Sequence, residues 1–193
     1  KTRLRTYFHR IDDIIDIIPL ADHTEGVGNL PRATRMGFES TNTIQFDPVG
    51  FKGAKLDLTI GMERTRVKDP LTGEQRSISA QRNRWVSAEF RHDIPGTPMA
   101  WGASASHDHF TRDFRLTEVS RSWEGPWWVG VFVEHKDVFG LTVRADVGNL
   151  LNARHRWTRY VYEDWRDQAG LDFIQRNNQL IGPIFELSVK GTF

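Results

Sequence analysis

The sequence predicts an all-β fold, an antiparallel up-and-down meander of about eight long strands. Three observations predict it: apolar side chains recur at every second residue, the alternating runs are long, and turn-forming residues separate them. Phe139, Leu141 and Val143, for example, alternate with Gly140 and Thr142. Residues two apart lie on the same face of a strand, so each run has one apolar and one polar face.

The first half of the chain contains four of these runs. It opens directly into an alternating segment, and the second run ends at the turn sequence Asp47–Gly50. The third is the most regular, because Leu56, Leu58 and Ile60 share a face, whereas the fourth alternates more weakly. We expect strands at about Arg3–Ile17, Thr34–Phe46, Phe51–Arg66 and Arg76–His92.

The second half contains four more. Val129, Val131 and Val133 share one face in the sixth run, and the chain ends in an alternation that includes Phe185 and Leu187. We expect strands at about Met99–Phe110, Glu118–His135, Phe139–Tyr162 and Asp172–Phe193. No linker or repeat divides the sequence, so residues 1–193 are expected to form a single domain.

The connections alternate in length. Three are short and rich in Gly, Pro and Asp, and they fall at Asp47–Gly50, Asp93–Pro98 and Lys136–Val138. The others are mostly longer, at Pro19–Ala33, Val67–Gln75, Thr111–Thr117 and Glu163–Leu171. Long strands with short turns at one end and long loops at the other are typical of outer-membrane barrels. We therefore expect the meander to be part of a transmembrane β-barrel.

In such a barrel the apolar face meets lipid and the polar face meets the lumen. Phe139, Leu141, Val143 and Ala145 would face lipid, whereas Glu134, Arg144, Asp146, Glu186 and Lys190 suit a watery interior. Trp and other aromatic side chains favour the membrane interface. We expect a girdle near the short turns made of Phe90, Trp101, Phe139 and Phe193.

Composition excludes several other classes. The 26 basic and 25 acidic residues give a net charge of +1, without the basic excess that a nucleic-acid partner requires. The chain has no cysteine, which removes thiolate zinc sites and thiol nucleophiles. No apolar run approaches the ~18 residues of a membrane-spanning helix. No catalytic or dinucleotide-binding signature is present, so we expect neither an enzyme nor a cofactor.

Two clusters of possible metal ligands are also interpreted as ordinary polar surface. His107 and His109 share a strand face, yet no third ligand can be identified. Asp12, Asp13 and Asp16 lack the spacing and the glycine of a calcium loop. We therefore predict no metal site.

Two stretches in the C-terminal third have a distinctive form: residues 141–152 alternate and close with Asn149-Leu150-Leu151-Asn152, and residues 185–193 alternate and end in an aromatic residue. They resemble the penultimate and the last barrel strands of a TonB-dependent outer-membrane receptor. Residues 7–15 are similar to an earlier strand. These receptors are 22-stranded barrels with a plugged lumen. The resemblance implies that residues 1–193 are the C-terminal segment of such a barrel, without its plug.

The resemblance also implies a role and a set of partners. The role is energy-coupled uptake of a scarce nutrient, such as an iron–siderophore complex, across the outer membrane of a Gram-negative bacterium. The partners are outer-membrane lipid, a small-molecule ligand, the barrel-assembly machinery and, through the plug, an inner-membrane energy-coupling protein. The side chains presented to the assembly machinery would be Phe185, Leu187, Val189 and Phe193.

Cations and indoles are enriched on the side of the long loops, where an incoming ligand would arrive. This chemistry suits an anionic or sugar-like ligand. The candidate ligand-facing residues are Arg112, Arg115, Arg121, Trp123, Arg156, Trp157, Arg159 and Trp165. Two other protein classes remain open: a self-contained eight-stranded outer-membrane barrel acting as an anchor or adhesin, and a soluble lipocalin-like ligand-binding barrel.

Overall fold

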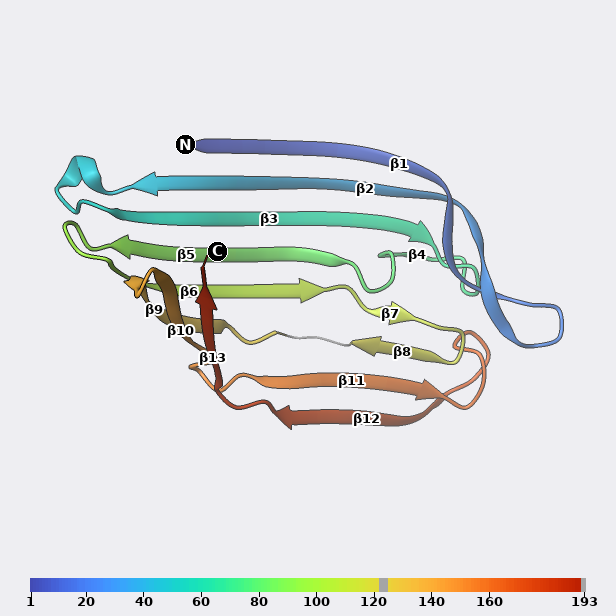
Figure 1. Ribbon diagram of the computed structural model, residues 1–193. Coiled ribbons are helices and arrows are strands. Elements are labelled where there is room, and N and C mark those ends of the chain that lie inside the picture. The colour runs from blue at the N-terminus through green and yellow to red at the C-terminus, as the bar shows by residue number, and fades with distance from the viewer. Residues whose placement is uncertain (122–124, 192–193) are drawn as a thin grey trace.

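The computed structural model describes residues 1–121 and 125–191, and this part of the chain is almost entirely β-strand (Figure 1). The strands are β1 Thr2–Pro19, β2 Glu25–Gln45, β3 Ala54–Lys68, β4 Gln75–Arg76, β5 Arg82–Asp93, β6 Met99–Phe110, β7 Asp113–Phe114, β8 Glu118–Arg121, β9 Trp128–Val138, β10 Leu141–Gly148, β11 Arg154–Tyr162, β12 Leu171–Leu180 and β13 Ile184–Lys190. A single 3₁₀ turn, Asp47–Val49, joins β2 to β3. Within the described residues, no helix is long and apolar enough to span a membrane.

The strands form an antiparallel meander, which confirms the predicted fold class. One sheet has the order β1-β2-β3-β5-β6-β9-β10-β13, with β4 paired to β3, and a smaller sheet has the order β12-β11-β8-β7. The smaller sheet continues the last four strands of the larger one in the same order: β7, β8, β11 and β12 are adjacent in the chain to β6, β9, β10 and β13. Each of the last three predicted strands therefore contributes one piece to each sheet, and β7 follows shortly after β6. Among the described residues β1 and β13 do not pair with each other, so the larger sheet is open.

The second strand begins earlier than predicted, at Glu25 rather than Thr34. Most of the predicted connection Pro19–Ala33 is therefore strand: Gly26 and Gly28 both pair with β1, and a Cβ atom on Gly28 would lie 2.2 Å from the Ile18 side chain. The glycines thus make room for bulky side chains on the neighbouring strand. Pro31 falls opposite Asp13, whose φ of 57° marks an irregularity where the ladder skips a pair.

The predicted strand Arg76–His92 was also too long at its start. Only Gln75 and Arg76 form the short strand β4, and β5 begins at Arg82. The intervening residues leave the ladder because Ile78 packs inward against Val67, and its amide donates to the Thr65 hydroxyl at 3.1 Å. Burial of one isoleucine therefore replaces strand pairing here.

The three other long strands are interrupted. Glu118–His135 divides into β8 and β9, Phe139–Tyr162 into β10 and β11, and Asp172–Phe193 into β12 and β13. Only Met99–Phe110 matches its predicted bounds.

The sequence Asn149-Leu150-Leu151-Asn152 forms the turn that separates β10 from β11. The Asn149 side chain is fully buried; its Oδ1 accepts from the Ala153 amide at 2.6 Å. Its Nδ2 donates to the carbonyls of Ala153 at 3.2 Å and of Gly182 at 2.7 Å. Gly182 lies between β12 and β13, so one asparagine joins the two neighbouring breaks. These bonds replace the ladder bonds that the breaks remove.

The short turns gather at one end of the meander and the long loops at the other, as predicted (Figure 1). Lys190 pairs with Thr142, so the last strand ends beside the tight turn between β9 and β10. That turn falls at Phe139–Gly140 and not at the predicted Lys136–Val138, which complete β9. It is a two-residue hairpin loop in which Phe139 and Gly140 have φ values of 54° and 82°. Positive φ at both positions suits a tight hairpin, because its twist matches that of the strands.

One continuous surface of the larger sheet, here called the apolar face, carries almost all of its exposed large hydrophobic side chains. The strand registers place these residues opposite one another from β1 to β13. Phe185, Leu187 and Val189 on β13 are 76%, 70% and 57% exposed. The apolar face contains Phe8, Met36, Phe38, Ala54, Leu56, Leu58, Ile60, Met62, Val86, Ala88, Phe90, Trp101, Ala103, Ala105, Val131, Val133, Val143, Ala145, Val147, Phe185, Leu187 and Val189.

The opposite surface, here called the polar face, is the more covered of the two. On β3, Met62, Arg64 and Arg66 are exposed, whereas the alternate residues Glu63 and Thr65 are buried. The segment between β3 and β5 folds back over this side near the long loops. There Ile78 completes a small apolar cluster with Leu30, Ala33 and Val67.

Candidate functional site

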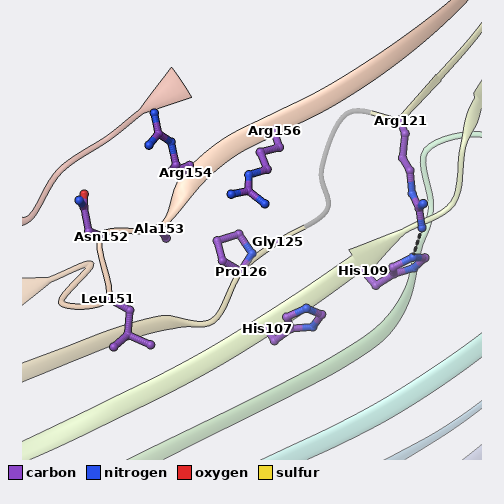
Figure 2. A pocket seen from close by; sticks show the side chains of 10 residues that line it. All are labelled: His107, His109, Arg121, Gly125, Pro126, Leu151, Asn152, Ala153, Arg154 and Arg156. Carbon is purple, nitrogen blue, oxygen red and sulfur yellow. Dashed lines mark hydrogen bonds between the residues drawn. The ribbon is translucent and has the colours of Figure 1, made fainter. Parts of the chain in front are cut away.

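The candidate ligand-contact site is a pocket of about 530 Å³ at the junction of the two sheets (Figure 2). His107 and His109 approach it from β6, Arg154 and Arg156 from β11, and Arg121 from the end of β8. β6 pairs with β9 only as far as Ser106 and Trp128. The pocket forms because the strands separate beyond that pair.

Hydrogen bonds fix the histidine at one end of the pocket. An Nη2 atom of Arg121 lies 2.6 Å from Nε2 of His109, and Nδ1 of His109 lies 2.6 Å from Oδ1 of Asn83 (Figure 2). A guanidinium can only donate, so Nε2 of His109 accepts and its Nδ1–H donates to Asn83. The imidazole is therefore held in one tautomer, and Arg121 is held in place by it.

The chemistry of this pocket suits an anion. Arg154 and Arg156 have exposed side chains on the same face of β11, and Nε of Arg156 lies 3.4 Å from Oδ1 of Asn178. Together with Arg121 they surround the pocket with three guanidinium groups. Arginine binds carboxylate and phosphate oxygens through paired N–H donors. No acidic side chain lines the pocket within the described residues.

The structure brings together only two of the eight predicted ligand-facing residues, Arg121 and Arg156. Arg112 lies over the Tyr160 ring at 5.9 Å, and Nε of Arg159 pairs with Glu118 at 3.3 Å. Trp157 follows Arg156 on the same strand and so points to the other side of it.

The remaining predicted residues take part in contacts between loops, except for Trp123, which lies outside the described residues. Arg115 pairs with Glu25, and Trp165 stacks on His23 with ring centroids 4.2 Å apart. His23 also lies 2.8 Å from Asp164. These contacts join the first long loop to the last, and they leave Arg115 and Trp165 bonded within the protein.

A buried carboxylate lies at the centre of the long-loop end. Asp69 is 2% exposed, and its oxygens accept from the amides of Leu71 and Thr72, both at 3.0 Å. They also accept from Arg76 at 2.6 Å and from Arg166 at 2.9 Å. Burial acts to raise the pKa of Asp69, but the Thr72 amide and the two guanidinium groups lower it to about 2. Arg76 reaches further, to Asp16 on β1 at 2.9 Å.

Sequence reasoning missed Arg154 and the roles of Asp69 and Asn149. The position of Arg154 could have been inferred, because it lies two residues before Arg156 on an alternating strand. Asn149 was singled out only as part of the motif that carries the family resemblance, and Asp69 carried no signal beyond its residue type. The roles of both depend on partners that lie far away in the sequence. Among the described residues, no group of three or more His, Cys, Asp or Glu side chains could hold a metal ion.

Two further sets of predicted residues, those of the barrel-assembly signal and those of the aromatic girdle, are only partly among the described residues. Phe185, Leu187 and Val189 lie together on the apolar face of β13, and Phe193 is outside the described residues. In the expected girdle, the rings of Phe90 and Trp101 pack 5.3 Å apart near the short turns.

Comparison with protein-family models, with curated proteins and with solved structures finds no match to this chain.

Proposed function

We propose that this chain forms part of the wall of an outer-membrane β-barrel, as the C-terminal segment of a receptor that takes up a scarce nutrient such as an iron–siderophore complex. The observation that carries the proposal is the apolar face, which continues from β1 to β13 across the larger sheet and has large exposed hydrophobic side chains on β1, β2, β3, β6, β9 and β13. A soluble protein rarely leaves a contiguous apolar surface larger than a few hundred Å² in contact with water. In a lipocalin-like barrel this face would be enclosed, whereas here it is the exposed one.

The length of the apolar face fits a bilayer. On β3 its uncharged run extends from Ala54 to Met62, and at about 3.4 Å per residue it is about 27 Å long. The outward-facing apolar band of outer-membrane barrels is ~25 Å tall, and its strands are tilted. The run therefore has roughly the length that a membrane-crossing strand needs.

Both borders of the apolar face have the chemistry of a membrane interface. At the short-turn end, Phe46, Phe51, Phe90 and Trp101 form an aromatic cluster, and Nε1 of Trp101 donates to His92 at 3.1 Å. Such aromatic side chains favour the level of the lipid headgroups. At the long-loop end the same face continues into cations with exposed side chains, Arg64, Arg66, Lys68 and Arg84. Lipid phosphate groups would lie opposite these cations.

The polar face suits water. Arg91 donates to Glu134 at 2.5 Å, and Arg144 donates to Asp146 at 2.6 Å. The guanidinium of Arg144 also lies 3.7 Å from the centre of the Phe132 ring. Charges of both signs alternate across neighbouring strands on this side. On the apolar face, the ion pairs of Asp12 with Arg10 and Arg32 lie beyond Phe8, at the long-loop border. This segregation supports a wall with lipid on one side and a water-filled lumen on the other.

In the proposed role, the loops and their arginine-lined pocket contact the ligand, and the strands hold the loops at the outer surface. The energy-coupling protein would act through a plug, and the apolar side chains of β13 would be presented to the barrel-assembly machinery. The pocket of Figure 2 offers three guanidinium groups to an anion. It lies on the side of the apolar face, beyond its long-loop border, because His107 pairs with Val86 and follows Ala105 on the same side of β6. An anionic ligand, such as a metal chelate with carboxylate groups, would therefore approach this pocket from the outer edge of the wall.

Spin labelling of β13 in lipid vesicles tests the proposal. The chain has no cysteine, so single cysteines can be introduced at Phe185, Glu186, Leu187, Ser188 and Val189 without removing others. We expect labels at 185, 187 and 189 to collide with oxygen dissolved in the lipid. Labels at 186 and 188 should instead collide with a water-soluble nickel chelate.

The two accessibilities should therefore alternate with a period of two residues. Nickel accessibility at all five positions would place both faces in water and refute the membrane assignment. Labels at 185, 187 and 189 that neither reagent reaches would indicate the enclosed apolar cavity of a soluble barrel. A label at Asp137, an exposed residue at the end of β9 beside the tight turn, provides the water-exposed reference for nickel access.

A further inference from the structure

A second pocket, of about 230 Å³, lies on the polar face where the first strands approach the long loops. It is separate from the arginine-lined pocket of Figure 2, and its residues come from β1, β2, β3 and β5 and the residues just before β5. They include Arg5, Tyr7, Arg35, Glu39, Glu63 and Trp85. Sites for drug-sized ligands measure roughly 300–1,000 Å³. This pocket therefore suits something smaller, about the size of a single sugar ring.

Two aromatic rings lie directly on the sheet and form a firm floor. A Cβ atom added to Gly37 would lie 2.4 Å from the Tyr7 ring, and one added to Gly61 would lie 2.1 Å from the Trp85 ring. Glycine is required at both positions, because any side chain there would displace the ring above it. The guanidinium of Arg82 lies 4.6 Å from the Trp85 ring centre and holds that ring from above.

The Glu63 carboxylate has one oxygen with hydrogen-bond donors and one oxygen without a donor. Its Oε2 accepts from the Tyr7 hydroxyl at 2.5 Å and from Nε of Arg35 at 2.6 Å. Its Oε1 is buried and accepts from no group in the described part of the chain. The side chain as a whole is 1% exposed. Buried polar atoms almost always have a hydrogen-bond partner, so Oε1 points to a ligand that donates.

Trp85 presents the complementary requirement. Its Nε1–H is buried and has no acceptor among the described residues. Trp85 pairs with Gly61 across the β3–β5 ladder, two residues from Glu63 on the same side of the sheet. The pocket thus contains a free acceptor and a free donor on neighbouring strands, at diagonal positions that lie roughly 7–8 Å apart or less.

A ligand for this pocket has to satisfy both atoms, and this requirement limits its chemistry. A phosphate or carboxylate would accept from Trp85 but would be repelled by Glu63 and Glu39. An ammonium group would satisfy Glu63 but would meet Arg5 and Arg35, and it has no lone pair for Trp85. Hydroxyl groups both donate and accept, and a ring with several of them can serve both atoms.

We propose that this pocket binds one ring of a neutral polyhydroxylated ligand, a sugar, whose hydroxyl groups donate to Oε1 of Glu63 and accept from Nε1 of Trp85. Tyr7 and Arg35 position the carboxylate by holding its other oxygen. The inference concerns the polar face alone, so it does not depend on what contacts the apolar face.

Calorimetric titration of the full chain, folded in detergent micelles, tests this binding. The probes are glucose, galactose, mannose and maltotriose, with inorganic phosphate and citrate as anionic alternatives. We expect at least one of the sugars to bind. Trp85→Phe keeps a ring over Gly61 without the N–H group, and Glu63→Gln keeps the shape without the charge. Each should weaken sugar binding by about tenfold, the effect of one lost hydrogen bond.

The matched control is Trp101→Phe, which removes an indole N–H on the apolar face, where it already donates to His92. This variant should bind sugar like the parent chain. Sugars should also reduce quenching of tryptophan fluorescence by acrylamide in the parent chain, and this effect should disappear in Trp85→Phe. The unfolding midpoint of each variant shows whether it has kept its fold.

Three results would overturn the proposal: that none of the four sugars binds, that the folded Trp85 and Glu63 variants bind as the parent does, or that phosphate or citrate displaces the sugar. Each of these is independent of the spin-label result. A lipid-facing β13 without sugar binding would leave the wall assignment intact and refute the sugar site alone.

Discussion

Replacing Asn149 by alanine should destabilise the protein more than any other change in the turn between β10 and β11. The substitution removes three hydrogen bonds and leaves the buried amide of Ala153 without an acceptor. Loss of these bonds should cost about 2–4 kcal/mol. The φ of 55° at this position adds about 1 kcal/mol for alanine, because its Cβ crowds the backbone there. The expected loss is about 3–5 kcal/mol in total.

Two variants separate these contributions. Asn152→Ala is the matched control, because Asn152 has a similar φ of 52° and an exposed side chain, so only the backbone cost of about 1 kcal/mol applies. In Asn149→Gly, glycine adopts the positive φ without strain and only the hydrogen bonds are lost. The free energy of unfolding should therefore fall by about 2–4 kcal/mol.

The assay is urea unfolding of the full chain in detergent micelles, followed by far-ultraviolet circular dichroism and tryptophan fluorescence. The expected order of stability is parent, Asn152→Ala, Asn149→Gly and Asn149→Ala. If Asn149→Ala proves no less stable than Asn152→Ala, the buried amide does not hold the junction between the breaks, and the reasoning is refuted.

Three further outcomes are expected. Leu187→Arg should lower the stability of the chain in bilayers by ~2–4 kcal/mol while Ser188→Arg on the other face changes it little; equal effects in vesicle unfolding titrations would contradict the assignment of faces. The folded pKa of Asp69, about 2, lies below its ordinary value of 3.8, so its contribution of about 2 kcal/mol is complete above pH 4 and is lost as the pH falls towards 2. Over that range, the protection of amides 68–82 against hydrogen exchange, measured relative to the intrinsic rate at each pH, should fall. Protection that does not change with pH would speak against the ion cluster. Gly61→Ala should lower stability by about 1–3 kcal/mol, because the new methyl group clashes with the facing indole ring. Gly148→Ala should be tolerated, since the nearest atom to its new Cβ is 3.9 Å away. Similar thermal midpoints for the two variants would show that the ring moves freely.

The alternation of side chains was sufficient to predict the fold class and the two faces. Val131, Val133 and Leu187 alternate with polar residues in the sequence, and they share the apolar face in the structure. Turn chemistry also located the short-turn end, because Asp, Pro and Gly mark tight turns locally. These features could be predicted because each depends on neighbours within a few residues.

The breaks and the pockets could not be predicted in this way. The turn at Asn149 depends on a carbonyl 33 residues away, and Asp69 depends on an arginine 97 residues away. Nor does the sequence reveal that Arg115 is paired with Glu25 instead of being available to a ligand. Partners set by strand register and loop packing carry no local pattern, so most of the predicted contact residues were dispersed by the structure.

The convergence of Arg76 and Arg166 on Asp69 has a consequence for engineering this end of the molecule. Because Arg76 also binds Asp16, three distant stretches of chain meet in this ion cluster, and a change in the length of any of them would disturb the other two. Peptide tags and reporter insertions are better placed at Gly96 or Gly140, where the hairpin tips have open space around them. The short-turn end therefore tolerates insertions, whereas the loops of the opposite end have to be redesigned together.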